Sequence, residues 1–179
     1  MEDRVLIERV LGGDREAFRP LVERYEGLVF GVVSALVGDR MHAEDLAQET
    51  FLAVFSALDR FDPARERFSV WIAAIARNKS RNHLKAAGRR QHEAMPADVE
   101  ADGRAPLSRE PDFFRALDGA LAELPAEQRV AFVLAEVHGV AHDEIAAVED
   151  VAIGTVKSRV HRARKRLRSA LGALMEERT

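Results

Sequence analysis

The feature that most limits how this chain can fold is a stretch rich in proline and acid near its middle. Residues 91–112 contain three prolines, one glycine and six carboxylates among few apolar side chains. A segment of this composition cannot bury enough apolar surface to fold by itself. We therefore expect a flexible acidic linker over 93–111, between an N-terminal unit over 1–92 and a C-terminal unit over 112–179. Each unit is close to the smallest size that folds independently.

Both units have the composition of helices rather than of strands. Aromatic residues make up only 6% of the 179 residues, and Ala, Leu, Arg and Glu dominate. These residues favour helix, whereas strands are usually marked by alternating runs of β-branched and aromatic residues. We expect an all-α fold of two small helical domains, of which the first is a helical bundle.

Breaks between apolar runs predict four helices in the N-terminal unit. The first ends at two consecutive glycines, after which Asp14 can cap a second helix. Pro20 lies beyond the first turn of that second helix and indicates a kink or a late start. A third helix is expected over 41–58. Ser69 is a candidate N-cap for a long fourth helix that reaches Arg90, with an apolar first half and a basic second half.

The C-terminal unit ends in a short helix, a tight break and a long basic helix. The short helix is expected over 142–149 and the break over 150–152. In the long helix, a buried stripe is predicted by apolar residues spaced four, three and four apart, namely Val156, Val160, Ala163 and Leu167. This order of elements is the signature of a helix-turn-helix, whose second helix enters the DNA major groove.

The charges of the chain are segregated along its sequence. Residues 67–92 and 151–169 each hold seven Lys or Arg and no acid, which leaves thirteen basic and thirty acidic residues elsewhere. Such segregation indicates two surfaces for a polyanion, with acidic surfaces left for a basic partner or for autoinhibition. Solvated helix faces would give the same pattern, so charge alone leaves both interpretations open.

The basic half of the fourth helix carries two amide side chains one turn apart, Asn78 and Asn82, beside a stripe of cations at Arg77, Arg81, Lys85 and Arg89. Aromatic residues precede them at Phe61, Phe68 and Trp71. This combination suits single-stranded DNA as well as duplex, because unpaired bases stack on aromatic rings. The alternative, which the residues alone favour, assigns the aromatic rings to the core and the amides to solvent.

Catalytic and metal-binding patterns are weak. Asp45 and Glu49 lie one turn apart, but no histidine or further carboxylate joins them at metal-ligand spacing. His138 and His142 are four apart, but Gly139 should end a helix between them. The chain has no cysteine, glycine-rich phosphate loop or nucleophile motif. We therefore expect no enzymatic activity, metal or cofactor. With neither a signal peptide nor an apolar run of spanning length, we expect a cytoplasmic protein.

Four stretches, in this order, resemble the extracytoplasmic-function group of bacterial sigma factors of the sigma-70 class. They read GDREAFRPLVERY, AEDLAQETFLAVFSALDRF, FSVWIAAIARNKSRNHLKAAGRR and LPAEQRVAFVLAEVHGVAHDEIAAVEDVAIGTVKSRVHRARKRL. The resemblance implies a sigma factor that directs core RNA polymerase to specific promoters in a stress response. It implies a region 2-like domain over 1–92 that binds polymerase, reads the −10 element and assists melting. It implies a region 4-like domain over 112–179 that reads the −35 element.

The resemblance also implies residues for each contact. Core polymerase would be bound by Glu44, Asp45, Gln48 and Glu49. The −10 element, with a flipped base held in a pocket walled by the loop 62–69, would be bound by Phe61, Asp62, Phe68, Ser69, Trp71, Arg77, Asn78, Arg81, Asn82 and Lys85. The −35 element would be bound by Thr155, Lys157, Ser158, Arg159, His161, Arg162 and Lys165.

The sequence departs from the family pattern at three positions. Asn82 stands where many relatives carry Asp, which should alter the −10 preference. Ala141 replaces a frequent Ser cap, and Asp150 replaces Gly in the turn, where Asp tolerates a left-handed conformation better than most residues. The implied partners are the clamp helices and flap of core polymerase, promoter DNA and an anti-sigma factor, with no direct membrane insertion.

Two other functional classes are alternatives to this interpretation. A stand-alone helix-turn-helix repressor or activator would need no polymerase and usually dimerises on a palindrome. Such a protein has no use for the acidic face of the third helix or for an asparagine pair beside a single-strand pocket. A metal-dependent hydrolase would require ligands that the sequence does not supply.

Overall fold

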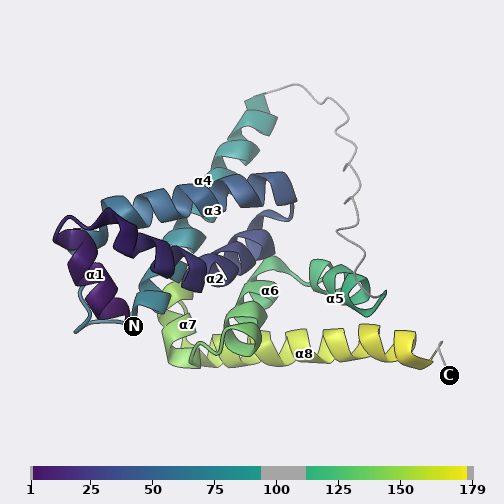
Figure 1. Cartoon of the computed structure of the whole chain (residues 1–179). Coiled ribbons are helices and arrows are strands. Elements are labelled where there is room, and N and C mark those ends of the chain that lie inside the picture. The colour runs from purple at the N-terminus through teal and green to yellow at the C-terminus, as the bar shows by residue number, and fades with distance from the viewer. Residues whose placement is uncertain (1, 94–111, 177–179) are drawn as a thin grey trace.

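The computed structural model describes residues 2–93 and 112–176, and every regular element within these ranges is a helix (Figure 1). The all-α expectation is therefore confirmed for the described parts of the chain. The expected acidic linker lies outside the described residues except for residue 93. Among the described helices, none is long and apolar enough to cross a membrane.

The first domain consists of four α-helices and two short 3-10 turns. In chain order these are α1 (Asp3–Leu11), η1 (Arg15–Phe18), α2 (Arg19–Val37), α3 (Arg40–Ser56), η2 (Leu58–Arg60) and α4 (Phe68–Glu93). The second domain consists of four α-helices and a short π-helix. These are α5 (Asp112–Ala122), α6 (Ala126–Phe132), the π-helix η3 (Val133–Val137), α7 (His142–Glu149) and α8 (Ile153–Glu176).

The helix boundaries follow local chemistry, with two corrections to the predicted caps. Pro20 lies in the first turn of α2, which starts late after η1, as expected for a residue without a backbone N–H. Asp14 does not cap this helix, because its carboxylate accepts a hydrogen bond from the Arg9 guanidinium at 2.6 Å. Ser69 is not an N-cap either, because α4 already begins at Phe68 and Ser69 is buried within its first turn.

The predicted helix-turn-helix is confirmed in the second domain. The short helix α7 ends at Glu149 and is followed by Asp150, which adopts a left-handed conformation with φ of 53° and ψ of 52°. At the start of α7, the Glu144 carboxylate accepts a hydrogen bond from the backbone N–H of Ala141 at 3.1 Å, so the helix keeps half of a capping box without a serine. The predicted stripe of α8 is buried, at Val156, Val160, Ala163 and Leu167.

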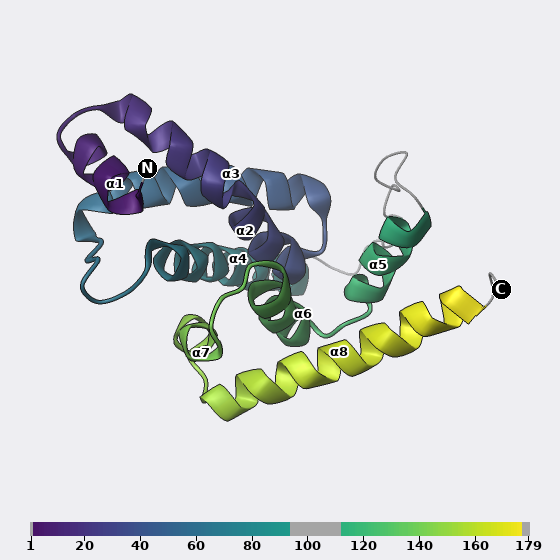
Figure 2. The same cartoon turned by 60° about the horizontal axis from the view of Figure 1, so that its bottom comes forward.

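The two domains pack directly against each other, which the sequence analysis did not predict. Helix α2 lies at the centre of the first domain, between α3 and α4, and also packs on α6 and η3 of the second domain. Helix α7 packs on α4 (Figure 2). One contiguous core includes Val32 and Ala76 of the first domain together with Val130, Leu134 and Ile145 of the second. The two domains therefore share a hydrophobic core in this structure.

Candidate nucleic-acid and polymerase interfaces

The basic half of α4 projects away from the rest of the molecule (Figure 1). Asn78 and Asn82 are both exposed one turn apart, and the cations that follow the same stripe, Arg81 and Lys85, are exposed as well. Amide groups in this position are free to donate and accept hydrogen bonds with base edges. The structure therefore leaves the predicted asparagine pair open to solvent and to ligands.

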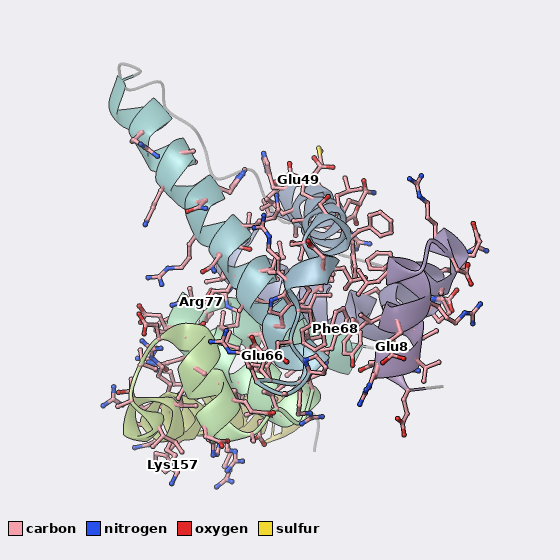
Figure 3. All side chains as sticks on the ribbon, turned by 90° about the vertical axis from the view of Figure 1, so that its left-hand side faces the viewer. Glu8, Glu49, Glu66, Phe68, Arg77 and Lys157 are labelled. Carbon is pink, nitrogen blue, oxygen red and sulfur yellow. The ribbon has the colours of Figure 1, made fainter. Side chains whose placement is uncertain are left out.

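Arg77 differs from the other cations of this stripe. Its side chain is only 10% exposed and lies 3.1 Å from the carboxylate of Glu149, which is 6% exposed at the end of α7. The guanidinium also donates a hydrogen bond to the backbone oxygen of Glu149 at 2.6 Å. In Figure 3, Arg77 lies at the junction of α4 and the second domain. One member of the predicted −10 set is thus bound within the protein.

The aromatic residues before α4 form a cluster of rings. Phe68 is buried and contacts Phe61, Tyr25 and Trp71, with ring centroids 5.3, 5.3 and 5.8 Å apart. Burial, and after it the hydrogen bond donated to Asp3, raises the pKa of Tyr25 far above its usual range, so its hydroxyl remains a donor. The core assignment of Phe68 is thereby confirmed, while Phe61 and Trp71 are half-buried at its edge.

A hollow of about 870 Å³ opens beside the loop that precedes α4. It is lined by Phe61 and by residues 63–70, which are the end of the loop and the first residues of α4. Asp62 is exposed, and its carboxylate accepts a hydrogen bond from the backbone N–H of Ala64 at 2.9 Å, which fixes a turn in the loop. The loop therefore has a fixed turn next to a hollow that is large enough to hold a small ligand group. The second domain also lines the hollow, through Asp143, Glu144 and Ala147 of α7.

On α8, the predicted −35 residues divide into an outer and an inner group. Lys157, His161, Arg162 and Lys165 are exposed, and Figure 3 shows Lys157 at the outer edge of the second domain. Thr155 and Ser158 are half-buried, and the Ser158 hydroxyl donates to the Thr155 backbone oxygen at 3.1 Å.

Arg159 belongs to the inner group and points into the second domain. Its side chain is 17% exposed and lies 3.4 Å from the Glu149 carboxylate and 3.8 Å from that of Glu127. Arg164, further along α8, forms an exposed ion pair with Glu136 at 2.6 Å, which raises the pKa of Arg164. The structure thus directs Arg159 toward the buried Glu149 and the exposed Glu127 of its own domain rather than toward the outer surface of α8.

The acidic face predicted on α3 is present and exposed, at Glu44, Asp45, Gln48 and Glu49. Two of its carboxylates have cationic neighbours: Glu44 pairs with Arg40 at 2.6 Å, and Glu49 pairs with Lys79 of α4 at 3.1 Å. No group of three or more His, Asp and Glu within the described ranges is arranged to hold a metal ion.

Sequence reasoning missed two apolar residues on the same helix. Met41 and Leu52 are 73% and 68% exposed. Together with Asp45 and Gln48 they follow the spacing of four, three and four that places residues on one helical face. The signal was present in the sequence, because Leu52 lies off the buried stripe that contains Leu46, Thr50 and Val54.

A contact between the domains was also missed. His138 lies against α2 at Gly27 and Gly31, where a Cβ atom on Gly31 would come within 3.1 Å of the imidazole Nε2. Burial lowers the pKa of His138 below its usual value. The two glycines one turn apart on α2 were a visible sign of close approach, but they did not show which segment would approach.

Comparisons with known proteins agree with this geometry. The family described as Sigma-70 region 2 matches residues 21–90, and the family described as Sigma-70, region 4 matches residues 114–167. The RNA polymerase sigma-H factor of Pseudomonas aeruginosa is 34% identical over 190 aligned residues, covering 98% of this chain and 97% of the relative. The ECF RNA polymerase sigma-E factor of Escherichia coli is 35% identical, covering 92% of each chain.

Two solved structures are similar over nearly the whole chain. The sigma factor RpoE in complex with the anti-sigma factor NepR from Bartonella quintana has a TM-score of 0.75 at 28% identity, covering 87% of this chain and 96% of that one. CnrH in complex with the cytosolic domain of CnrY has a TM-score of 0.66 at 26% identity, covering 96% and 97%. Sequence families, full-length relatives and fold all agree: this chain belongs to the extracytoplasmic-function group of the sigma-70 family of RNA polymerase sigma factors.

Proposed function

We propose that this sigma factor acts through three separate surfaces, one for polymerase and two for promoter DNA. Residues 1–92 would bind core polymerase, read the −10 element and assist melting, and residues 112–179 would read the −35 element, with 93–111 as the connection. The observation that carries the proposal is the presence of one exposed basic helix in each domain, α4 and α8, together with an exposed acidic and apolar face on α3. A protein that bridges polymerase and two promoter elements requires all three.

The polymerase surface is the face of α3 that includes Asp45, Gln48, Leu52 and Met41. The carboxylates would meet basic clamp helices, and Leu52 would supply the apolar centre that binding surfaces need. Asp45→Lys should weaken binding to core polymerase, with a loss that shrinks as salt is raised, because rim charges act mainly on association. Glu23→Lys, which reverses the charge of an exposed carboxylate on α2 outside this face, is the control. Equal affinity of Asp45→Lys and the unaltered chain at low salt would contradict this docking surface.

For the −10 element, the supporting features are the exposed pair Asn78 and Asn82 on α4 and the hollow beside the loop that precedes this helix. Extrusion of a base from the stack costs a few kcal/mol, which a pocket offsets through stacking and hydrogen bonds to the base edge. Phe61 and Trp71 at the rim of the aromatic cluster offer stacking surfaces. Arg81 and Lys85 would contact phosphates.

For the −35 element, the supporting feature is the outer face of α8. Lys157, His161 and Arg162 lie on the N-terminal half of the helix that follows the turn, which is the half that enters the major groove in this motif. Lys165 lies further along and suits a phosphate contact. Arg159, held by Glu149 and Glu127, would serve to fix α8 on the rest of its domain.

We infer further that the protein has no chemical step of its own and works in the cytoplasm beside polymerase. An anti-sigma factor is the expected inhibitory partner, because both solved structures of similar fold contain a bound protein, which in the structure of the sigma factor RpoE is named an anti-sigma factor. Recovery of a stoichiometric inhibitor from unstressed host cells, in a pull-down that also recovers polymerase subunits, would support this partner. Repeated recovery of polymerase alone would count against it.

In vitro transcription with purified core polymerase on a promoter library tests the proposed function. Transcripts should start downstream of a pair of elements at −35 and −10 and should require this chain. A stand-alone repressor would instead bind a palindromic duplex without polymerase and give no transcripts. Core polymerase that initiates equally well with and without the chain would exclude the proposed function.

A further inference from the structure

Two histidines from different helices of the first domain lie side by side. His42 is in the first turn of α3 and His83 is in the basic half of α4. Their ring centres are 5.3 Å apart, and the ring planes are tilted by 52°. Because the two residues are some forty positions apart in the chain, no sequence motif marks the pair. Neither ring belongs to the surfaces proposed above for polymerase or for DNA.

The spacing of these two rings matches that of histidines bound to one metal ion. Zn²⁺ binds an imidazole nitrogen at about 2.0–2.1 Å with tetrahedral geometry, which places the centres of two such rings about 5 Å apart. A tilt of 52° is neither the offset-parallel nor the edge-to-face arrangement that rings in direct contact prefer. Imidazole is a common ligand of zinc, copper, iron and nickel ions. The pair therefore has the ligand type and the spacing of a transition-metal site.

A carboxylate determines which nitrogen of His42 is available to a metal. The Nδ1 atom of His42 contacts the carboxylate of Asp39. An ionised carboxylate only accepts hydrogen bonds, so Nδ1 carries the proton and donates it. In the neutral ring the lone pair is then on Nε2, which can bind a metal. Histidine ligands of metals commonly donate their other ring nitrogen to a carboxylate in this way, which orients the ring.

Helix packing fixes the backbone of both histidines. Asp39 is the N-cap of α3 and also accepts a hydrogen bond from the backbone N–H of His42 at 3.3 Å. Helix α3 packs on α4, and an ion pair between Lys79 and Glu49, at 3.1 Å, joins the same two helices one turn before His83. Side chains on packed helices hold a ligand geometry more precisely than side chains on loops. A metal ion would therefore meet a pair that is already assembled.

The pair supplies two protein ligands and leaves the other coordination positions to water. Within the part of the chain that the structure describes, no third His, Asp or Glu completes the group. Glu44, on the next turn of α3, is paired with Arg40 at 2.6 Å. The side chain of His42 is 57% exposed, so an ion has direct access from solvent. Structural zinc sites have four protein ligands, whereas sites with open positions exchange what they bind. The arrangement thus fits an exchangeable ion that folding does not require.

We propose that His42 and His83 bind one divalent transition-metal ion, with Zn²⁺ as the expected occupant, and that Asp39 orients the His42 ring toward it. The ion would connect the start of α3 to the projecting half of α4. The site goes beyond the function proposed above and does not depend on it, because it can be detected without polymerase or promoter DNA. Bound to the folded chain alone, the ion would also stabilise the first domain.

The first experiment is isothermal titration calorimetry of the full chain, without an affinity tag and freed of metal with a chelator, using ZnCl₂ as the probe. The unaltered chain should bind one ion, and His42→Gln and His83→Gln should each abolish this binding. Glutamine keeps a hydrogen-bond donor and a good helix propensity. His142→Gln, in α7, removes one histidine as well and should bind zinc unchanged. MgCl₂ should give no signal, because Mg²⁺ prefers oxygen ligands.

A second pair of variants tests the carboxylate. Asp39→Asn keeps an N-cap residue at the start of α3 but removes the charged acceptor of the His42 ring. Its affinity for Zn²⁺ should fall about 10–100-fold, as is typical when the carboxylate behind a histidine ligand is lost. Asp118→Asn removes the same charge at an exposed position of α5 and should leave the affinity unchanged. Equal zinc affinity of Asp39→Asn and the unaltered chain would contradict the orienting role.

Nuclear magnetic resonance of the ring nitrogens identifies the bound atoms in the unaltered chain, without any substitution. Zn²⁺ should shift the Nε2 resonance of His42, whose Nδ1 keeps its proton, and should shift a ring nitrogen of His83 at the same ion concentration. Circular dichroism verifies that each variant is folded. The midpoint of thermal unfolding should rise with Zn²⁺ for the unaltered chain and for His142→Gln, but not for His42→Gln or His83→Gln.

Each result either supports the site or overturns it. One bound ion that is lost in both His42→Gln and His83→Gln, and kept in His142→Gln, supports the shared site. Unchanged zinc binding in either of the first two variants overturns it, because the ion would then be held elsewhere or by one ring alone. An unaltered chain that binds no zinc overturns it as well. Transcription with core polymerase is a separate test, whose failure contradicts the proposed function and leaves the metal site standing.

Discussion

Helices α4 and α8 carry similar runs of cations, yet the structure uses them differently. On α8, Lys157, His161 and Arg162 all face solvent, and the buried stripe of this helix packs within its own domain. On α4, Arg77 is buried against the other domain. The first half of α4 thus packs against the second domain, while its second half projects away from the rest of the molecule. A basic window in a sequence indicates where cations are gathered, and only the fold shows which of them already have a protein partner.

The difference follows from what covers each helix. The apolar stripe of α8 needs only α5, α6 and α7 to bury it, and these are close in sequence. The apolar half of α4 is covered by α2 and α3 and also by α7, which comes some seventy residues later. A helical pattern predicts that a face is buried but not the identity of the element that buries it. Arg77 was accordingly predicted as a DNA contact from the same stripe that contains the exposed Arg81.

The largest expected effect concerns the shared core. Leu134→Ala removes a fully buried side chain of η3 and should lower the free energy of unfolding by about 2–5 kcal/mol. Because Trp71 is the single tryptophan and lies in the first domain, its fluorescence reports whether a change in the second domain is felt there. Urea titration should show an earlier Trp71 transition for Leu134→Ala.

Leu167→Ala is the control for this prediction. Leu167 is buried in a small separate cluster with Leu124 and Ala163 inside the second domain. Its truncation should shift the transition seen by circular dichroism much more than the one seen by Trp71. Identical Trp71 midpoints for Leu134→Ala and the unaltered chain would mean that the two domains unfold independently, which contradicts a shared core.

On α8, Arg162→Ala should weaken binding of holoenzyme to its promoter by about 1–3 kcal/mol and relax selectivity at one or two −35 positions. Lys165→Ala should instead weaken binding to all sequences alike and lower the salt slope by about one. The measurement is a salt series with holoenzyme on promoters that differ only at −35. Equal losses by Arg162→Ala on specific and scrambled elements would show that α8 supplies charge without reading sequence.

On α4, Asn82→Asp should change the preferred −10 base. The difference in binding free energy between the preferred base and the others should be about 1–3 kcal/mol, as is typical for a single base pair. The physical reason is that a carboxylate accepts hydrogen bonds only, whereas an amide both donates and accepts. A promoter library read by in vitro transcription gives the preference, and Arg162→Ala serves as the comparison, since it should leave the −10 preference unchanged. The same −10 preference for Asn82→Asp and the unaltered chain would remove Asn82 from the reading surface.

The smallest expected effect is on pH dependence. Burial against α2 lowers the pKa of His138, so a proton binds more readily once the two domains separate. The contact between the domains is therefore most stable above the ordinary histidine pKa of about 6.5 and weakens as the pH falls below it. The urea midpoint of the Trp71 fluorescence transition should decrease between pH 7.5 and pH 5.5. His138→Gln should flatten this change, and an unaltered profile in that variant would assign the effect to other groups.

Much of the fold could be predicted from local patterns. The stripe of α8, the left-handed turn at Asp150 and the late start of α2 each depend on a few neighbouring residues, and the structure agrees with all three. The caps at Asp14 and Ser69 were wrong because local competition was decided differently: the Arg9 guanidinium took the Asp14 carboxylate, and α4 begins at the buried Phe68, two residues earlier than a Ser69 cap would allow. Short-range competition of this kind is hard to rank from sequence.

The candidate surfaces could be predicted from the sequence less completely than the helices could. The exposed residues of α3, α4 and α8 follow from helical spacing once the buried faces are known. The inward orientation of Arg77 and Arg159 could not be predicted, because both depend on Glu149, whose position is set by the packing of α7 on α4. A carboxylate in a helix-turn-helix gives no local sign that it will be buried between two guanidinium groups of different domains.

The shared core also has a consequence for the order in which the protein is made. The first domain leaves the ribosome before α5 to α8 exist, and at ordinary rates of synthesis the remaining half of the chain takes on the order of ten seconds. During that time Gly27 and Gly31 of α2 have no imidazole packed against them, and Arg77 has no carboxylate from α7. Each newly made molecule therefore passes through a period in which the first domain exposes its part of the shared core. Chaperones, proteases and polymerase would all meet it in that form before the second domain arrives.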